Sequence, residues 1–174
     1  MSLEIKTIAV LGAGTMGHGI AGQAARFGCT VVLNDVDDAR VQKGLEGIRG
    51  VFQTGVAKGK LAAADAEAAL ARIRLDTSIE SAVAGADLIV EAVPEQMDLK
   101  RELFARVEAA APAHAVLGSN TSSLSITEIA AATKSPQRVV GLHFFNPVAV
   151  MPLLEIVRGE HTSADTLAAV RAFG

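Results

Sequence analysis

His143 and Glu155 are the side chains whose types and spacing best suit acid–base chemistry. His143 ends an apolar stretch and is followed by Phe144 and Phe145, which would keep water away from its ring. Because histidine titrates near neutral pH, this imidazole can accept a hydroxyl proton while hydride leaves carbon. Glu155 lies in the next apolar stretch and can orient the imidazole if the two strands pair antiparallel. The same residues also suit a buried histidine satisfied by a carbonyl oxygen, with Glu155 facing solvent.

A glycine-rich turn, Gly12-Ala13-Gly14-Thr15-Met16-Gly17, follows an apolar strand and opens a helix. Gly12 permits the tight turn, Gly14 lets the backbone approach a pyrophosphate, and Gly17 lets the helix pack closely on the strand. Asp35 follows the second strand, where a carboxylate can accept hydrogen bonds from the adenosine ribose, and its charge repels a 2′-phosphate. The unit predicts an NAD site rather than an NADP site. The alternative is a turn that only caps a helix, with Asp35 as the N-cap of the next helix.

Polar residues follow two further apolar strands. Glu91-Ala92-Val93-Pro94-Glu95 ends one of them, with Lys100 on the helix beyond, and Ser119-Asn120-Thr121-Ser122-Ser123 follows the other. Ligands of doubly wound sheets bind at the carboxyl ends of the strands, so both segments should face the cofactor. The charged residues equally suit a solvated helix start, and the short polar ones can serve only as turns and caps.

The elements that must position these residues are short apolar runs that alternate with helical patterns. Several runs are continuously apolar, which is typical of strands buried on both faces of a parallel sheet. The sequence therefore predicts one α/β domain over residues 1–174, a Rossmann-type doubly wound, mainly parallel sheet with helices on both faces. The predicted strands are 7–11, 30–33, 73–75, 87–90, 115–117, 139–142 and, as an edge strand, 154–157. The predicted helices are 18–27, 36–56, 62–71, 98–111, 129–132 and 166–173.

Three patterns predict where helices begin. Asp98 is placed to cap the helix that follows it. Ser125 with Glu128, and Thr162 with Asp165, form capping-box patterns ahead of two further helices.

Composition excludes several classes of protein. Of the 174 residues, 50% are hydrophobic and 20% are charged, which rules out intrinsic disorder. The net charge is −3 and no basic run occurs, so we expect no nucleic-acid partner. A single cysteine, Cys29, excludes a disulfide framework and a four-thiolate metal site and suits the reducing cytoplasm, and we expect no metal. No apolar stretch reaches the roughly 18–20 residues of a membrane helix, so we expect no membrane partner.

With these motifs assembled, the sequence resembles the NAD-binding domain of the L-3-hydroxyacyl-CoA dehydrogenase family, which includes 3-hydroxybutyryl-CoA dehydrogenases. The resemblance extends over about residues 5–157. Four stretches carry it: residues 10–17, 91–95, 119–124 and 141–147. The last two together are highly specific, whereas many dehydrogenases share the glycine turn.

The resemblance implies an oxidoreductase of fatty acid metabolism, including β-oxidation, which interconverts (S)-3-hydroxyacyl-CoA and 3-oxoacyl-CoA with NAD as cofactor. It implies that His143 is the general base and that Glu155 is its partner. It further implies that Ser122 hydrogen-bonds near the substrate hydroxyl and the cofactor, and that Asn146 lies beside the nicotinamide. The remaining positions implied to contact NAD are Gly12, Ala13, Gly14, Thr15, Met16, Gly17, Asp35, Glu95 and Lys100.

For the substrate, the resemblance implies that basic residues on the long helix after the second strand meet the phosphates of CoA. Lys58 matches one such position, and Ser122 also counts among the substrate contacts. Val51 stands where some members carry a CoA-contacting serine, so the resemblance does not extend to that contact.

The largest difference between this sequence and the family concerns the family's second domain. It is all-helical and supplies a catalytic asparagine, much of the acyl pocket and the dimer interface, and it is absent from these residues. We therefore expect the chain alone to be inactive or weakly active, and to form a homodimer when that domain is present. Residues 1–4 are expected to be flexible or to be left over from an expression tag.

Two alternative functions remain open. One is a non-catalytic NAD-binding or structural protein on the same scaffold, because fold does not fix function. The combined presence of Ser122, His143, Asn146 and Glu155 speaks against it. The other is a dehydrogenase of a hydroxy acid or sugar acid that carries no CoA.

Overall fold

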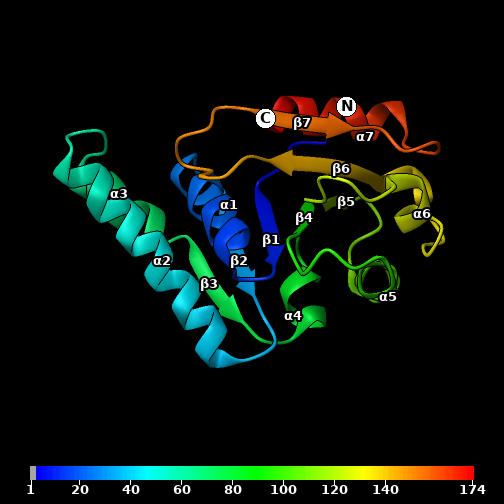
Figure 1. Cartoon of the computed structure of the whole chain (residues 1–174), viewed down its shortest axis with the longest axis horizontal. Helices are drawn as coiled ribbons and strands as arrows, with labels where there is room; N and C mark the ends of the chain where they lie inside the picture. Colours follow the sequence, from blue (N-terminus) through cyan, green and yellow to red (C-terminus); the bar gives the residue numbers. More distant parts are fainter. Residues whose placement is uncertain (1–2) are drawn as a thin grey trace.

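A seven-stranded sheet forms the centre of the computed structural model, which describes residues 3–174 (Figure 1). The strand order is β3-β2-β1-β4-β5-β6-β7, in which β1 to β6 are parallel and β7 pairs antiparallel with β6. Because the order reverses between β1 and β4, the sheet is doubly wound, and the predicted Rossmann-type architecture is confirmed. The strands are β1 (Thr7–Leu11), β2 (Thr30–Asn34), β3 (Ile73–Asp76), β4 (Leu88–Glu91), β5 (Val116–Ser119), β6 (Val139–Phe144) and β7 (Leu154–Val157).

The central strands are apolar on both faces, as strand β1 illustrates. Ile8 and Val10 belong to one core cluster, whereas Ala9 and Leu11 belong to the other. Successive side chains of a strand point to opposite faces, so a continuous apolar run fills both layers of core. All four of these residues are at most 1% exposed.

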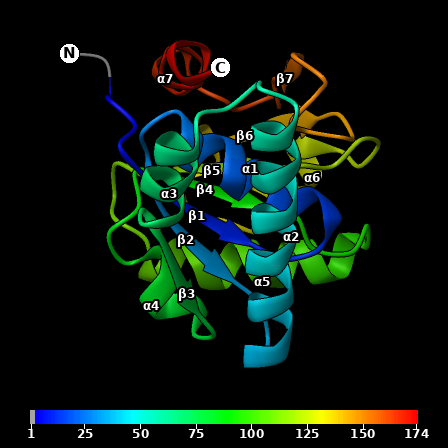
Figure 2. The ribbon, with the colours of Figure 1, turned by 90° about the vertical axis from the view of Figure 1, so that its left-hand side faces the viewer.

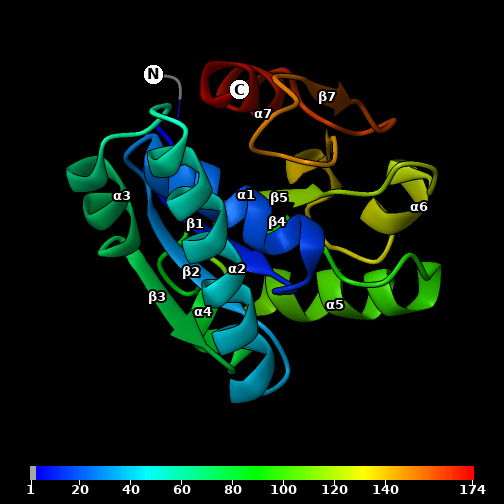
Figure 3. The ribbon, with the colours of Figure 1, turned by 60° about the vertical axis from the view of Figure 1, so that its left-hand side comes forward.

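Helices cover both faces of the sheet (Figures 1 and 3). One core cluster packs α1 (Thr15–Arg26), α2 (Asp38–Ala57), α3 (Ala63–Leu70) and α7 (Ala164–Phe173), and the other packs α4 (Ile79–Val83), α5 (Met97–Ala110) and α6 (Ile126–Ala130). A short 3₁₀ turn, η1 (Pro136–Arg138), leads into β6. Figure 2 shows α1, α2 and α3 on one side of the strands, with α7 at the end of the molecule where β6 and β7 lie.

One of the three predicted helix caps is confirmed. The hydroxyl of Ser125 accepts a hydrogen bond from the backbone N–H of Glu128 at the start of α6. The prediction that Asp98 caps α5 is wrong, because that helix already begins at Met97 and no side chain caps it. Asp98 therefore lies within the first turn, where its charge still complements the helix dipole.

The predicted cap at Thr162 is also wrong, by one residue. Ser163 caps α7 by accepting from the N–H of Thr166 at 3.1 Å. Thr162 instead donates to the carbonyl of Val139 at 2.7 Å, so it joins the loop before α7 to the start of β6. The buried position of its hydroxyl explains why it does not act as the cap.

At the N-terminus, Leu3 packs against the core, while Met1 and Ser2 of the expected flexible segment lie outside the described residues. Over residues 3–174, no helix is both long enough and apolar enough to cross a membrane.

Candidate active site

The sheet brings the candidate residues to one edge. Since β1 to β6 are parallel, the segments that follow β1, β2, β4, β5 and β6 all emerge at the same edge. Strand β7 runs the other way, so its first residues lie at that edge as well. The glycine turn, Asp35, Glu95, Ser122, His143 and Glu155 are thereby gathered from distant parts of the sequence.

The glycine turn needs two of its glycines for close packing. Gly12 has a φ of +100°, and a Cβ there would lie 2.6 Å from the carbonyl oxygen of Ala92. A Cβ on Gly17 would lie 1.6 Å from the carbonyl oxygen of Gly12. Gly14 differs, because a Cβ on it would meet nothing within 4 Å. The backbone at Gly14 is exposed and thus free to approach a ligand.

The N-terminus of α1 suits an anion. No side chain caps this helix at Gly14, and its first turn carries no acidic residue. The amide groups of Thr15, Met16 and Gly17 therefore have no side chain competing for them, and they carry the positive end of the helix dipole. This arrangement fits the pyrophosphate of a dinucleotide.

Asp35 ties the end of β2 to the glycine turn. Its Oδ2 accepts from the N–H of Ala13 at 2.8 Å and its Oδ1 from the N–H of Val36 at 2.7 Å. The alternative that Asp35 only caps the following helix is excluded, because Asp37 caps α2. Nη1 of Arg40 lies 3.9 Å from Oδ1, so the carboxylate beside the turn also makes a long ion pair.

His143 and Glu155 form a direct pair. They face each other across the β6–β7 ladder, and Nδ1 of His143 lies 2.8 Å from Oε2 of Glu155. A carboxylate can only accept, so Nδ1 carries the proton and Nε2 is left as the proton acceptor. The ring of Phe145 lies 4.5 Å from the imidazole centroid at an interplanar angle of 49°, and the His143 side chain is 19% exposed. The buried histidine satisfied by a carbonyl is therefore not observed.

Asn120 connects this pair to the loop after β5. Its Oδ1 accepts from the N–H of Phe144 at 2.9 Å, and its own N–H donates to the carbonyl of Glu91 at 2.9 Å. Sequence reasoning missed this role, and the only signal was the position of Asn120 directly after a strand. The bridge holds the ends of β4, β5 and β6 together beside the histidine.

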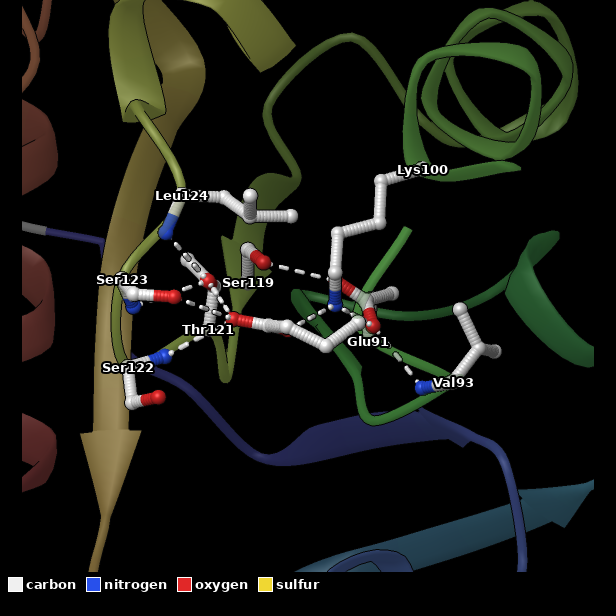
Figure 4. Close-up of polar contacts among 9 residues, drawn as sticks. Glu91, Val93, Lys100, Ser119, Thr121, Ser122, Ser123 and Leu124 are labelled. Carbon is white, nitrogen blue, oxygen red and sulfur yellow. Dashed lines mark hydrogen bonds and ion pairs between the residues drawn. The ribbon is translucent and has the colours of Figure 1, made fainter. Parts of the chain in front are cut away.

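A charged cluster lies beneath the loop after β5, as Figure 4 shows. Lys100 is 1% exposed, and its Nζ lies 2.6 Å from Oε1 of Glu91 and 3.2 Å from Oε2 of Glu95. Burial would raise the pKa of Glu95, but the hydrogen bond from Thr121 and the charge of Lys100 outweigh it and hold that pKa below its usual range. The sequence predicted that the segment from Glu91 to Glu95 faces the cofactor, whereas the Glu91 side chain is 1% exposed and pairs with Lys100. A strand-end carboxylate gives no sign of which helix faces it.

The other predicted site residues are exposed. Ser122 lies on the loop after β5, and Asn146 lies two residues past the end of β6. Lys58 follows the last residue of α2. Since α2 starts at the site edge and its 20 residues span about 30 Å, Lys58 lies at the far end of that helix. No group of three or more potential metal-binding side chains occurs among residues 3–174.

Two hollows flank the segment that joins β6 to β7. A cavity of about 220 Å³ lies between this segment, α1 and α2, and its walls include Thr15, His18, Val51 and Asn146. A mainly apolar groove of about 420 Å³ lies on the other side of the segment, lined in part by Phe144, Val150 and Leu153. His143 itself lines neither hollow, whereas its neighbours Phe144 and Asn146 line one each.

The comparisons with known proteins agree on one family. The family model described as 3-hydroxyacyl-CoA dehydrogenase, NAD binding domain, matches residues 7–174. The probable 3-hydroxybutyryl-CoA dehydrogenase of Bacillus subtilis (strain 168) is 44% identical over 170 residues, which cover 98% of this chain and 59% of that protein.

Solved structures give the same result. The crystal structure of (S)-3-hydroxybutyryl-CoA dehydrogenase from Ralstonia eutropha has a TM-score of 0.95 and 43% identity, covering 98% of this chain and 60% of that one. The NAD⁺-dependent 5-formyl-3-hydroxy-2-methylpyridine-4-carboxylic acid 5-dehydrogenase has a TM-score of 0.84 and 32% identity, covering 97% of this chain and 53% of that one. The chain thus spans between 53% and 60% of the length of these relatives.

Proposed function

The chain belongs to the 3-hydroxyacyl-CoA dehydrogenase family as its NAD-binding domain, and from this premise we propose that it serves the interconversion of (S)-3-hydroxyacyl-CoA and 3-oxoacyl-CoA. The observation that carries the proposal is the His143–Glu155 pair at the sheet edge that also holds the glycine turn. A domain that only bound a dinucleotide would not need a proton acceptor there.

His143 acts as the general base in this proposal. Glu155 accepts from Nδ1, so Nε2 faces the substrate with a free lone pair and takes the proton of the 3-hydroxyl. Glu155 also provides a negative charge beside the ring, which favours the imidazolium that forms. Phe145 packs at 4.5 Å from the ring centroid and limits the water that reaches it.

NAD, when bound, supplies the acceptor for the hydride that leaves C3 of the substrate. The amides of Gly14 and of the uncapped start of α1 would hold its pyrophosphate, and Asp35 would accept hydrogen bonds from the hydroxyls of the adenosine ribose. Ser122 would hydrogen-bond the substrate hydroxyl, and Asn146 would lie beside the nicotinamide. Glu95 would contact the cofactor from the segment after β4.

The CoA moiety extends along α2 in this proposal. The cavity of about 220 Å³ beside His18 and Val51 lies on the way from His143 to the far end of α2, where Lys58 is exposed. Lys58 meets a phosphate of CoA there. With the family's second, all-helical domain present, the protein would form a homodimer.

A second candidate is the oxidation of a hydroxyl on a substrate without CoA. It is favoured by the similarity to a dehydrogenase of a pyridine carboxylic acid. Val51 also offers no hydrogen bond to a CoA group. The two candidates share His143 and Glu155 and differ only in what α2 contacts.

Calorimetric titration of the 174-residue chain with NAD, combined with an NADH absorbance assay on 3-hydroxybutyryl-CoA, tests the proposal. We expect micromolar to millimolar NAD binding and weak turnover, since the chain holds the glycine turn and the His143–Glu155 pair but spans only 53% to 60% of the length of its relatives. Absence of NAD binding would refute the proposal. NAD binding with turnover of hydroxy acids but not of CoA thioesters would instead support the second candidate.

A further inference from the structure

Lys100 is an unusual residue for a buried position. A lysine ammonium loses much hydration energy on burial, and it persists in a protein interior only when it is paired. Its two partners come from one segment: Glu91 at the end of β4 and Glu95 four residues later. Glu91 is itself 1% exposed, whereas the Glu95 side chain is 40% exposed. The ammonium therefore links the interior to a surface carboxylate.

The buried Glu91 carboxylate fixes the position of the Lys100 ammonium. Its Oε1 accepts from the N–H of Val93 at 2.8 Å in addition to Lys100, and its Oε2 accepts from the hydroxyl of Ser119 at 2.6 Å. Every contact of the Glu91 carboxylate comes from a residue whose backbone is fixed in a strand, a helix or the turn between them. The position of Lys100 Nζ is consequently well defined.

The Glu95 carboxylate holds the loop after β5. Figure 4 labels the loop residues Thr121, Ser122 and Ser123. Its Oε1 accepts from the hydroxyl of Thr121, from the N–H of Ser122 at 3.3 Å and from the hydroxyl of Ser123 at 3.4 Å. Thr121 Oγ1 in turn accepts from the N–H of Ser123 at 3.3 Å and from that of Leu124 at 2.9 Å. The loop conformation thus depends on where the Glu95 carboxylate points.

We propose that Lys100 is a positioning residue that, anchored by Glu91, orients the Glu95 carboxylate so that it fixes the loop of residues 121–123. The consequence for catalysis, that the Ser122 hydroxyl is held ready for the substrate, rests on the proposed function. The contacts by which Lys100 and Glu95 hold the loop do not rest on the proposed function, because all of them lie within the chain.

The competing interpretation is that Lys100 only neutralises Glu91. Removing one partner of a buried ion pair leaves an uncompensated charge, so the single variant Lys100→Met would damage the fold under either interpretation. The double variant Glu91→Gln/Lys100→Met removes both charges, and the glutamine still offers an acceptor to Val93 and a donor to Ser119. It therefore separates the two interpretations.

Amide hydrogen exchange of the 174-residue chain, resolved by NMR, is the measurement. In the double variant we expect exchange at Ser122, Ser123 and Leu124 to be about tenfold faster or more, with protection in β1 and β4 unchanged. The matched control is Arg101→Met, which removes an exposed cation from the same helix and should leave the loop amides unaffected. A stable double variant with unchanged loop protection would overturn the proposal and leave Lys100 as a neutralising partner only.

A second measurement decides the matter if the double variant does not fold. In the unchanged protein, the ¹⁵N resonance of Lys100 Nζ is followed while Glu95 is titrated with acid. We expect it to shift together with the amides of Ser122 and Ser123, because one carboxylate contacts them all. A resonance that stays still while the loop amides move would overturn the proposal. NAD titration of the same samples tests the proposed function separately from the role of Lys100. A native protein that fails to bind NAD would refute the proposed function without affecting the positioning role of Lys100.

Discussion

Nδ1 of His143 lies 2.8 Å from Oε2 of Glu155, and the two residues are direct partners in the antiparallel pairing of β6 with β7. Strand pairing thus places the Glu155 side chain directly beside the imidazole ring. The Glu155 side chain is 52% exposed, so the pair lies at a surface that a substrate can reach.

Replacement of His143 by glutamine tests the pair. In the form of the protein that turns over substrate, His143→Gln is expected to lower kcat by roughly 10²–10⁴-fold, which is the usual contribution of general acid–base catalysis. NAD affinity should stay nearly unchanged, because the ring contacts no part of the glycine turn. Steady-state kinetics and NAD titration measure the two effects.

Glu155→Gln should lower kcat less than His143→Gln does, because the amide still bonds Nδ1 but offers no negative charge to the imidazolium. Glu160→Gln is the matched control, since it changes an exposed glutamate shortly after the same strand. Circular dichroism and thermal melts must show a native fold for all three variants. Near-normal turnover of His143→Gln would mean that another group is the base.

Replacing glycine by alanine should affect NAD binding at one position of the glycine turn and the stability of the fold at another. Gly14→Ala places a Cβ in open space, so it should cost no more than about 1 kcal/mol of folding free energy yet weaken NAD binding at least tenfold. Gly17→Ala should destabilise the fold itself, because its Cβ would meet the Gly12 carbonyl oxygen at 1.6 Å. Gly50→Ala, in an open position on α2, is the control and should leave NAD binding unchanged. Thermal melts and calorimetry distinguish the cases.

Asp35 predicts a preference for NAD over NADP of about tenfold or more, because its carboxylate would lie next to a 2′-phosphate. Asp35→Asn keeps an acceptor for the N–H of Ala13 but removes the charge, so the preference should shrink by about tenfold. Asp38→Asn removes a nearby exposed charge that makes no such contact and serves as the control. Titration of both cofactors gives the ratio, and equal affinities in the unchanged protein would contradict the assignment.

Acid stability should depend on Asp87 at the start of β4. Burial would raise its pKa, but the N–H groups of Lys6 and Thr7, each 2.9 Å from Oδ2, and His114 outweigh burial and lower it. A lowered folded-state pKa means that the unfolded chain takes up the proton first, so this stabilisation is complete above the unfolded value of about 3.9 and is lost as the pH falls through the folded value.

Asp87→Asn should therefore reduce the free energy of unfolding at pH 7 by about 1–3 kcal/mol and flatten its decline below pH 4. Denaturant unfolding followed by circular dichroism between pH 7 and pH 2 measures both. Glu67→Gln, an exposed position in α3, should change neither. A variant whose stability falls in parallel with that of the native protein at low pH would contradict the prediction.

The sequence predicted the strands better than the helix ends. Continuous apolar runs identify strands buried on both faces, and all seven predicted strands are present. The short helix α4 was missed, because five residues contain little more than one turn and give no helical period. The cap at Ser163 was assigned to Thr162 because adjacent hydroxyls look alike until tertiary contacts occupy one of them.

The candidate site was predictable where a motif lies within one segment. The glycine turn has its function in consecutive residues, and the pairing of His143 with Glu155 follows from two neighbouring strands. The Glu91–Lys100–Ser119 contacts join a strand end, a helix and a second strand. Such contacts depend on the distances between elements after folding, which no local pattern contains.

Because of the β6–β7 pairing, the position of Glu155 relative to His143 and the lining of the two hollows can change independently of each other. Side chains alternate along a strand, so a one-residue slip of β7 would place Leu154 or Ile156 opposite His143 and turn Glu155 to the other face. The residues between the two strands are under no such constraint on register, and they line both hollows. Substitutions there can therefore change the shape of the hollows while the contact between His143 and Glu155 stays intact.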